Sequence, residues 1–277
     1  MLKLNVVAFL ILLSLDIARS AITKRSPLKV AAFNIKGFGD AKMADVGNQI
    51  SSILANFDVV LVQEVRDKDL SALDALKTLL GSDLWDYVSS SPIGRSPYYQ
   101  EQYVFFYRKS SINVLGSFQY NDTLGDVFER DPFGLMIEYY SPAASHKVGV
   151  VVLGVHTQPE NAVAELQALP VVMASAKTQY PASSGVIAMG DFNADCAYVS
   201  STELSNLEVF TSPAYRSLIP HTADTTTATT TDCAYDRVVI QAGTDVIADQ
   251  AGVFTSGTTA EVAATISDHY PISFRLN

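Results

Sequence analysis

Apolar runs of strand length recur along this chain, separated by helical patterns and short polar segments. The runs cover residues 28–35, 58–65, 101–108, 133–140, 148–156 and 185–188, and two further strands begin at 234 and 266. Apolar residues at helical spacing predict helices over 42–56, 70–80 and 160–179. Because strands outnumber helices and their connections have both helical and hairpin lengths, the pattern predicts two packed sheets flanked by helices.

The strand at 185–188 leads directly into the sequence Gly-Asp-Phe-Asn at 190–193. Asp191 and Asn193 are two positions apart, so their side chains point to one face at the open end of the strand. A carboxylate there can bind a hard cation or an attacking water, and a carboxamide can donate to a phosphoryl oxygen. Taken alone, the same motif also fits an ordinary turn at a strand end.

Other predicted strands carry polar residues at the same kind of position. Glu64 lies in an otherwise apolar strand, where a carboxylate costs stability unless it is paired or binds a metal. We therefore predict a metal ligand at Glu64, with a buried ion pair to Arg66 as the alternative. In a sandwich the polar set would gather at one rim: Asn34, Glu64, Arg66, His156, Asp191, Asn193, Asp236, Asp268 and His269.

Composition changes this interpretation in two ways. The chain has 277 residues, 48% of them hydrophobic, and no linker or charge block divides it, so residues 28–277 are predicted to form a single domain. Its formal net charge is −10, so any contact with a polyanion must come from a local basic patch, helped by bound cations. The sequence shows no Gly-rich phosphate loop, no Cys/His zinc spacing and no Ser-centred elbow.

Residues 1–20 have the pattern of a secretory signal peptide. Lys3 precedes an apolar run over 4–15, and Ala-Arg-Ser at 18–20 forms a small-x-small cleavage site. A membrane anchor is the alternative, but the run is short for a bilayer span. We therefore predict a secreted, extracellular protein with no membrane contact after signal removal, and a dibasic pair at 24–25 allows a short propeptide to about residue 25.

Two covalent features are consistent with secretion. Cys196 and Cys233 are the only cysteines, and the secretory route favours a disulfide between them over two buried free thiols. The tripeptide Asn-Asp-Thr at 121–123 is a glycosylation sequon, so Asn121 can carry a glycan if its loop is exposed.

Two polar loops each have two interpretations. The Thr-rich segment 222–232 offers hydroxyls, carbonyls and the carboxylate of Asp224 for a calcium ion, or it is an unliganded polar loop. The loop 89–99 either packs its aromatic residues or touches a sugar-phosphate chain through residues of suitable composition, namely Arg95, Tyr98 and Tyr99.

The motifs taken together, in chain order from about residue 28 to the C-terminus, resemble the secreted deoxyribonuclease I family. That family belongs to the broader endonuclease/exonuclease/phosphatase superfamily. The matching pieces are Phe33-Asn34-Ile35, Gln63-Glu64-Val65-Arg66-Asp67, Glu101-Gln102-Tyr103-x-Phe105-x-Tyr107-Arg108, Arg130-Asp131-Pro132, Asp191-Phe192-Asn193-Ala194-Asp195-Cys196-x-Tyr198, Cys233-Ala234-Tyr235-Asp236-Arg237 and Ser267-Asp268-His269-Tyr270-Pro271.

The resemblance implies an α/β fold, a four-layered αββα sandwich of two mixed sheets flanked by helices. It also implies a divalent-metal-dependent endonuclease that hydrolyses double-stranded DNA with low sequence specificity and leaves 5′-phosphate ends. The implied cofactors are Mg²⁺ or Mn²⁺, with Ca²⁺ as a stabilising ion. A monomer is expected.

The resemblance also implies residue roles. Carboxylate–imidazole pairs, Glu101 with His156 and Asp236 with His269, would be catalytic. Metal and phosphate would be held by Asn34, Glu64, Asp191, Asn193 and Asp268. DNA would be contacted by Arg66, Arg95, Tyr99 and Arg130, and structural calcium by Asp224, Thr227 and Thr229.

The sequence departs from the family pattern at three places. The loop 116–130 lacks the small second disulfide of many relatives, leaving Asp122 and Asp126 as possible calcium ligands, and the Thr-rich loop is one residue longer. Residues 87–90 and Phe133 differ from the actin-binding pattern of the pancreatic enzyme, so we expect little inhibition by monomeric actin.

Two other functions remain alternatives at this point. One is a phosphodiesterase of the same superfamily that acts on a lipid or sugar phosphate, and the other is a non-catalytic binding protein. A binding protein would be free to lose catalytic residues, whereas this chain keeps the full set of Glu101, His156, Asp191, Asp236 and His269.

Overall fold

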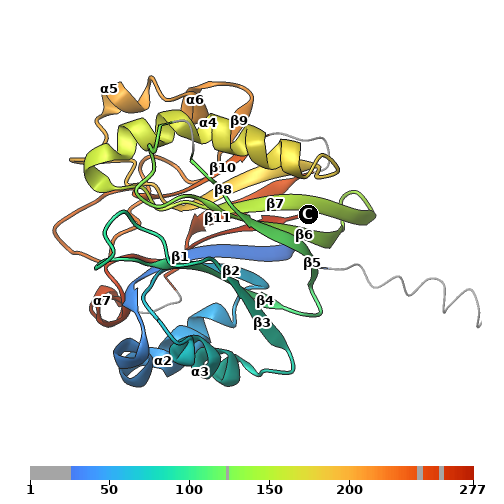
Figure 1. Ribbon diagram of the computed structural model, residues 1–277, viewed down its shortest axis with the longest axis vertical. Coiled ribbons are helices and arrows are strands. Elements are labelled where there is room, and N and C mark those ends of the chain that lie inside the picture. Colours follow the sequence, from blue (N-terminus) through green and yellow to red (C-terminus); the bar gives the residue numbers. More distant parts are fainter. Residues whose placement is uncertain (1–25, 123–124, 242–245, 256–258) are drawn as a thin grey trace, which may run out of the picture.

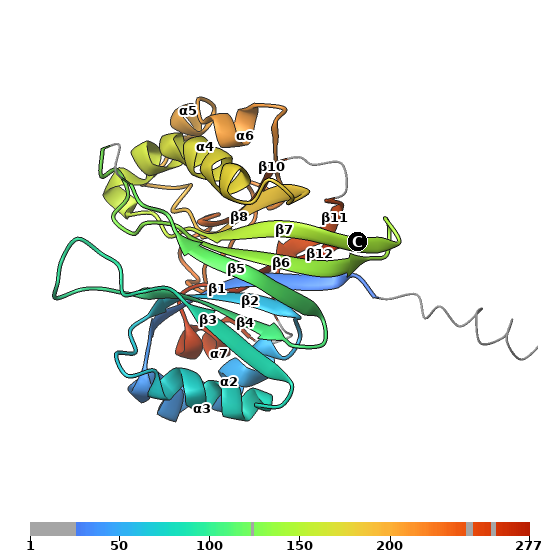
Figure 2. The same cartoon turned by 45° about the vertical axis from the view of Figure 1, so that its right-hand side comes forward.

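Two six-stranded sheets pack face to face, and helices cover both outer faces (Figures 1 and 2). The computed structural model describes residues 26–122, 125–241, 246–255 and 259–277. This arrangement confirms the predicted α/β sandwich of two mixed sheets flanked by helices. The predicted signal peptide and propeptide, residues 1–25, lie outside the described residues.

The first sheet contains one parallel pair, β1 with β2, and its other neighbours are antiparallel. Its outer face packs on α2 (Asp40–Leu54), α3 (Ser71–Leu80) and α7 (Ala260–Ile266). The strand order is β11 (Ala248–Val253), β12 (Ile272–Leu276), β1 (Leu28–Phe38), β2 (Val59–Val65), β4 (Gln102–Arg108) and β3 (Trp85–Ser89).

The second sheet also has one parallel pair, β7 with β8. The long helix α4 (Ala162–Gln179), entered through the 3-10 turn η1 (Pro159–Asn161), covers its outer face together with α5 (Ser201–Leu204) and α6 (Glu208–Thr211). The strand order is β5 (Ile112–Gln119), β6 (Phe133–Ser141), β7 (His146–Gly154), β8 (Gly185–Asp191), β10 (Asp236–Gln241) and β9 (Tyr215–Ser217).

Central strands are apolar throughout because each of their faces meets a different core. In β1, Val30 and Ala32 belong to the core between the sheets, whereas Ala31 and Phe33 belong to the core beneath the outer helices. Successive side chains of a strand point to opposite faces, so a strand buried on both sides has apolar residues at most positions. This explains why the central strands were predictable as continuous apolar runs.

The topology brings all the polar strand ends to one edge of the sandwich. β1 and β2 run in parallel, as do β7 and β8, so the carboxyl ends within each pair lie at the same edge. β10 runs antiparallel to β8 and pairs Asp236 directly with Asp191. β12 runs antiparallel to β1, so the residues just before it arrive beside the end of β1.

A disulfide joins Cys196 and Cys233 across a separation of 37 residues, which confirms the predicted bridge. A closed loop of this size stabilises the folded chain by roughly 3–4 kcal/mol. It ties the segment after β8 to the segment before β10. Within the described part of the chain, no helix is long and apolar enough to cross a membrane.

Candidate active site

The ends of β1 and β2 depart from regular strand geometry where the polar residues stand. The pairing register shifts between Asn34 and Phe38 in β1, and between Val62 and Val65 in β2. Glu64 itself has a φ of 56°, in the left-handed region. Such a conformation costs on the order of 1–3 kcal/mol for a residue with a side chain and is concentrated at functional sites.

Asn34 connects the first sheet to the second. Its side chain is fully buried, and its Nδ2 donates to Oε1 of Glu64 at 2.9 Å and to Oδ2 of Asp191 at 3.2 Å. Its Oδ1 accepts the backbone N–H of Lys36 at 3.0 Å, which fixes the orientation of the amide. Glu64 and Asp191 are thereby held on either side of one amide group.

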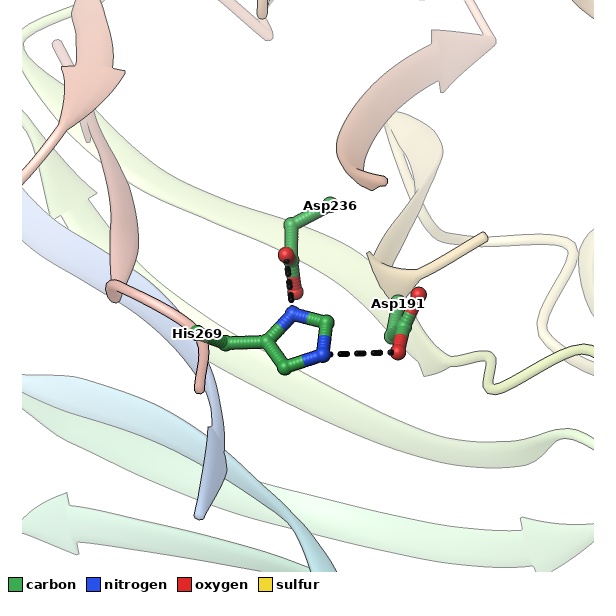
Figure 3. A group of neighbouring side chains, drawn as sticks. All are labelled: Asp191, Asp236 and His269. Atoms are coloured by element: carbon green, nitrogen blue, oxygen red, sulfur yellow. Dashed lines mark hydrogen bonds and ion pairs between the residues drawn. The ribbon is translucent and has the colours of Figure 1, made fainter. Parts of the chain in front are cut away.

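Asp191 lies between two imidazoles, and Figure 3 shows the one that belongs to His269. Oδ2 of Asp191 is 3.6 Å from Nε2 of His156 and 3.5 Å from Nε2 of His269. The opposite ring nitrogens are paired with other carboxylates: Nδ1 of His156 is 2.6 Å from Glu101, and Nδ1 of His269 is 2.7 Å from Asp236. Both pairs that the resemblance implies are present, with both Nε2 atoms turned to Asp191.

The carboxylates hold protons on these rings. Burial by itself lowers the pKa of His269, but the charges of Asp236 and Asp191 and the hydrogen bond to Asp236 raise it to about 10. Burial also lowers the pKa of His156, and Glu101 outweighs it, so the net direction is again upward. His269 is therefore an imidazolium at neutral pH when no metal is bound, and Glu101 favours the protonated form of His156.

Arg130 belongs to the interior of this network. Its Nε is 2.9 Å from Oε1 of Glu101, the oxygen that also binds His156, and the Arg130 side chain is only 11% exposed. Burial raises the pKa of Glu101, yet His156 and Arg130 together bring it below the ordinary value. Of the four residues predicted to contact DNA, Arg130 is thus paired with Glu101, a carboxylate predicted to be catalytic.

Gln63 holds the position of Asp191, although no role was predicted for this residue. Its Nε2 donates to the carbonyl of Val155 at 2.8 Å, and its Oε1 accepts the backbone N–H of Asp191 at 3.0 Å. This amide, fully buried at the end of β2, reaches across to the second sheet. Gly190 is required beside it, because a Cβ there would lie 2.4 Å from the Val155 carbonyl and 2.6 Å from Gln63.

Further buried polar groups hold the two histidines in place. The backbone N–H of His156 donates to the hydroxyl of Tyr103 at 2.7 Å, and Ser267 accepts the backbone N–H of His269 at 3.2 Å. Ser267 also donates to the carbonyl of Asn34 at 2.7 Å. A tyrosine or serine inside a buried stretch must find a hydrogen-bond partner, and that requirement, together with their place in the matching motifs, was the signal in the sequence.

The donor set fits a divalent cation. Single ligand atoms of Asp191, Asp236 and His269 lie within 4.8 Å of one another, and Glu64 is connected to them through Asn34. Asp236 is fully buried, and its Oδ1 has no hydrogen-bond partner among the described residues. Hard carboxylate oxygens with an excess of negative charge suit a hard divalent cation.

The remaining predicted metal and phosphate residues lie in the same cluster. Asn193 is buried; its backbone N–H donates to Oδ1 of Asp191 at 3.0 Å, and its Nδ2 donates to the carbonyl of Thr157 at 3.0 Å. Asp268 is half-exposed and pairs with Lys36, whose Nζ is 2.7 Å from its Oδ2. Lys36 was not predicted, although it follows the predicted strand 28–35 directly.

The other predicted DNA contacts lie outside the buried network. The guanidinium of Arg66 lies over the ring of Tyr99, 4.3 Å from its centroid, and both side chains are exposed. Arg66 is therefore not the buried ion-pair partner that was the alternative for Glu64. Arg95 pairs with Asp126, with 3.4 Å between Nε and Oδ2, so it is partly neutralised.

The three residues predicted to bind calcium lie in one loop, but their side chains have different environments. Oδ1 of Asp224 accepts the backbone N–H and hydroxyl of Thr226, at 3.0 and 2.8 Å. Thr227 is buried and donates its hydroxyl to Ser267, whereas Thr229 is exposed. Asn121, the predicted glycosylation site, is exposed, although Thr123 of its sequon lies outside the described residues.

Known proteins resemble this chain over most of its length. Residues 31–269 match the Endonuclease/Exonuclease/phosphatase family. The chain is 40% identical over 266 residues to Deoxyribonuclease-1 of Canis lupus familiaris, covering 90% of this chain and 91% of that protein. It is 38% identical over 282 residues to Deoxyribonuclease-1 of Gallus gallus, covering 95% and 98%.

Solved structures share the fold at low sequence identity. A humanized D. rerio TDP2 has a TM-score of 0.65 at 17% identity, with 91% of this chain and 100% of that chain covered. A mannosyl-6-phosphatase of Bacteroides thetaiotaomicron has a TM-score of 0.62 at 16% identity, covering 90% and 99%. With the family match and the curated relatives, we conclude that this chain belongs to the deoxyribonuclease I family of the endonuclease/exonuclease/phosphatase superfamily.

Proposed function

We propose that this protein is a secreted, divalent-metal-dependent endonuclease that hydrolyses DNA phosphodiester bonds with low sequence specificity and leaves 5′-phosphate ends. One observation carries the proposal. Two carboxylate–imidazole pairs present their Nε2 atoms to the same carboxylate, at 3.6 and 3.5 Å. Two positioned imidazoles facing one small space are what an in-line displacement at phosphorus requires, one for each proton transfer.

The imidazoles divide the proton transfers between them. One takes the proton of the attacking water, and the other gives a proton to the leaving 3′ oxygen. Glu101 and Asp236 fix the rings through Nδ1, so that only Nε2 faces the reacting phosphate. Their negative charge also stabilises each imidazolium while it holds its proton.

A divalent cation in this site would neutralise negative charge on the phosphate as it builds up in the transition state. Glu64, Asp191 and Asp268 are the carboxylates that we propose to hold it. Asn34 and Asn193 are placed to position these carboxylates, because Asn34 donates to Glu64 and Asp191 and Asn193 donates its backbone N–H to Asp191. Lys36 adds a positive charge beside Asp268, where it can also meet a DNA phosphate.

DNA is proposed to lie across this edge of the sandwich. Arg66 and Tyr99 form an exposed stacked pair next to Glu64, and such pairs contact the sugar-phosphate backbone without selecting a base. Arg95 and Arg130 are proposed to contribute positive potential, reduced by their acidic partners. Recognition of backbone and groove width gives cutting that varies with DNA shape and has no fixed site.

The remaining proposals concern the state of the secreted protein. We propose that residues 28–277 act as one nuclease domain and a monomer. We also propose that Asp224, Thr227 and Thr229 hold a stabilising calcium ion, that Asn121 is a glycan acceptor, and that actin inhibits weakly. An exposed Asn121 and the signal-like residues 1–20 support secretion.

The experiment is plasmid nicking in Mg²⁺ and in a chelator, with analysis of the ends formed. The wild type is expected to nick in Mg²⁺ only, and ligase should reseal the nicks because their ends are 5′-phosphates. His269→Ala should cut on the order of 10²–10⁴ times more slowly. His146→Ala is the matched control, since His146 is exposed at the start of β7, away from the site.

An intact plasmid, together with release of phosphate from a lipid or sugar phosphate ester, would contradict the proposed substrate. Nicking that persists at the wild-type rate in His269→Ala would contradict the proposed mechanism.

A further inference from the structure

Helix α4 begins at the edge of the sandwich where the site residues gather. It runs from the end of β7 back to the start of β8, so its first turn lies near the end of β7, which His156 follows (Figure 1). That first turn contains Glu165, which is 1% exposed. A buried carboxylate is unfavourable unless it is bonded or has a function, and the proposed mechanism gives this one no role.

One oxygen of Glu165 bonds two separate segments of the chain. Its Oε1 accepts the backbone N–H of Glu129 and the backbone N–H of Gln158, each at 3.2 Å. Its other oxygen, Oε2, is buried and has no hydrogen-bond partner among the described residues. The side chain therefore links the segment before β6 to the turn after β7.

Each of these two segments carries a residue of the site. Arg130 follows Glu129 directly, and His156 lies two residues before Gln158. The two site residues also contact each other, since Nη1 of Arg130 donates to the carbonyl of His156 at 3.4 Å. Glu101 joins them from the other sheet, because its Oε1 is 2.9 Å from Nε of Arg130 and 2.6 Å from Nδ1 of His156. The link thus ties together the two segments whose side chains meet at Glu101.

The link depends on the position of an oxygen atom rather than on its charge. Burial raises the pKa of Glu165 to about 7, although the two N–H groups and the charges of Arg130 and His156 lower it. Near neutral pH the neutral acid is therefore a normal state of this side chain. A neutral carboxyl group keeps a carbonyl oxygen that accepts hydrogen bonds, so the link persists in both states.

We infer that Glu165 is a positioning residue for DNA cleavage, which fixes the spacing between Arg130 and His156 by bonding the backbone of both segments. The inference rests on the proposed function, because it concerns the reaction that His156 is proposed to assist. Since Glu165 is buried, it acts through these two neighbours and does not contact the DNA.

Two substitutions separate the reach of this side chain from its charge. Glu165→Asp keeps the carboxylate but is one methylene shorter, so its oxygen cannot reach both N–H groups. Glu165→Gln loses the charge but keeps the length and the carbonyl oxygen. Neither change adds a heavy atom to the buried side chain, so both variants are expected to fold.

Cleavage of duplex DNA in Mg²⁺ gives kcat and KM for each variant. Misplacement of His156 and Arg130 in Glu165→Asp should lower kcat on the order of 10–100-fold. Its KM should change by less than about threefold, because the exposed cations Lys36 and Arg66 are untouched. The conservative variant Glu165→Gln should keep kcat within about threefold of the wild-type value.

Met173→Ala is the matched control for a loss of stability. Met173 is buried further along the same helix, in the core that α4 covers, so its truncation leaves a cavity without touching either segment. Each kcat is divided by the folded fraction, which circular dichroism measures under the assay conditions. After this correction Met173→Ala should have the kcat of the wild type.

A second readout does not depend on catalysis. The Nδ1 proton of His156 lies in a short hydrogen bond to Glu101, so its NMR signal should lie far downfield and report the alignment of the two groups. In protein with labelled histidine, the signal is assigned by its loss in His156→Ala. It should move in Glu165→Asp and stay in place in Glu165→Gln and Met173→Ala.

Wild-type kcat in Glu165→Asp, or an unmoved His156 signal, would overturn the inference. So would an equal loss of kcat in Glu165→Gln or in Met173→Ala, because charge or stability alone would then explain the effect. A wild type that does not cut DNA would contradict the proposed function, and the His156 signal would still decide whether Glu165 positions this ring.

Discussion

At the scale of single residues, the structure brings the predicted site residues together, but the sequence did not indicate the groups that position them. Asn34, Glu64, His156 and Asp191 stand out because each ends an apolar run. Gln63 belongs to such a run as well, yet its function depends on Val155 and Asp191, which come from the other sheet. A residue whose partner is a distant backbone group leaves no local signal, because any polar side chain would look the same in the sequence.

Gln63→Leu tests this positioning role. The change leaves the Val155 carbonyl and the Asp191 N–H without their partner, so we expect a loss of about 2 kcal/mol in the free energy of unfolding. Displacement of Asp191 should lower cleavage by roughly 100-fold. Urea unfolding and plasmid nicking measure the two effects. Gln49→Leu, an exposed site on α2, is the control, and full activity in Gln63→Leu would rule out the role.

Gly190→Ala probes the same contact from the other side. The added Cβ would meet the Val155 carbonyl and Gln63, and the φ of 130° is unfavourable for any side chain. Strain and overpacking together should lower the free energy of unfolding by about 3 kcal/mol, measured by thermal denaturation. Gly252→Ala, where a Cβ meets nothing within 4 Å, should change little. Equal stability of the two variants would contradict the close approach.

At the scale of elements, the sequence predicted the central strands of both sheets but not the strands at their edges. The four strands absent from the prediction, β3, β5, β9 and β11, are the two edges of each sheet. An edge strand has a partner on one side only and is partly exposed, so its residues do not form a continuous apolar run. β5 shows this as an alternation of buried and exposed residues, and its last residues, 116–119, were assigned to a loop.

Helix α4 contains a buried acid that makes stability depend on pH. Glu165 is 1% exposed, its Oε1 accepts the backbone N–H groups of Glu129 and Gln158, and burial raises its pKa to about 7. The unfolded chain ionises this group near pH 4.5, so the folded state becomes less stable as the pH rises from there to about 7.

Glu165→Gln removes this ionisation. Urea unfolding measures the free energy of unfolding at pH 5 and at pH 8. Between these two pH values, this free energy should fall by about 3 kcal/mol more in the wild type than in the variant. Glu160→Gln, an exposed neighbour on η1, should behave like the wild type. The same pH dependence in wild type and Glu165→Gln would contradict the shifted pKa.

The disulfide is the covalent link between the segments after β8 and before β10. Replacing Cys196 and Cys233 together by Ala should lower the free energy of unfolding by roughly 3–4 kcal/mol, because the unfolded chain regains the freedom of the opened loop. Asp195 bonds the N–H of Ala234 at 2.8 Å and partly retains the link. If urea unfolding shows a loss below about 1 kcal/mol in the free energy of unfolding, the Asp195–Ala234 hydrogen bond holds the two segments together without the disulfide.

At the scale of the whole molecule, an acidic protein is proposed to bind an acidic polymer. The net charge of −10 opposes approach, so binding depends on the few cations at the active edge. The sequence predicted this dependence, but not that Arg95 and Arg130 would each be paired with a carboxylate. Those pairs join segments far apart in the chain, and only the assembled fold reveals them.

The salt dependence of DNA binding measures how many cations of the protein contact DNA phosphates. Each phosphate contact lowers the logarithm of the binding constant by about 0.9 per tenfold increase in salt. Arg66→Ala should reduce that slope by about 1, measured by the KM for duplex DNA between low and high NaCl. Lys147→Ala, exposed at the start of β7, should leave the slope unchanged. An unaltered slope in Arg66→Ala would exclude a phosphate contact by this residue.

The amide of Asn34 bridges Glu64 of one sheet and Asp191 of the other, so neither half of the chain contains a complete site. From the proposed roles of these residues, we expect cleavage only after the two sheets have packed together in the correct alignment. The time at which nicking appears during refolding should therefore report when the two sheets have packed together. We expect a newly made chain to leave DNA uncut before that step.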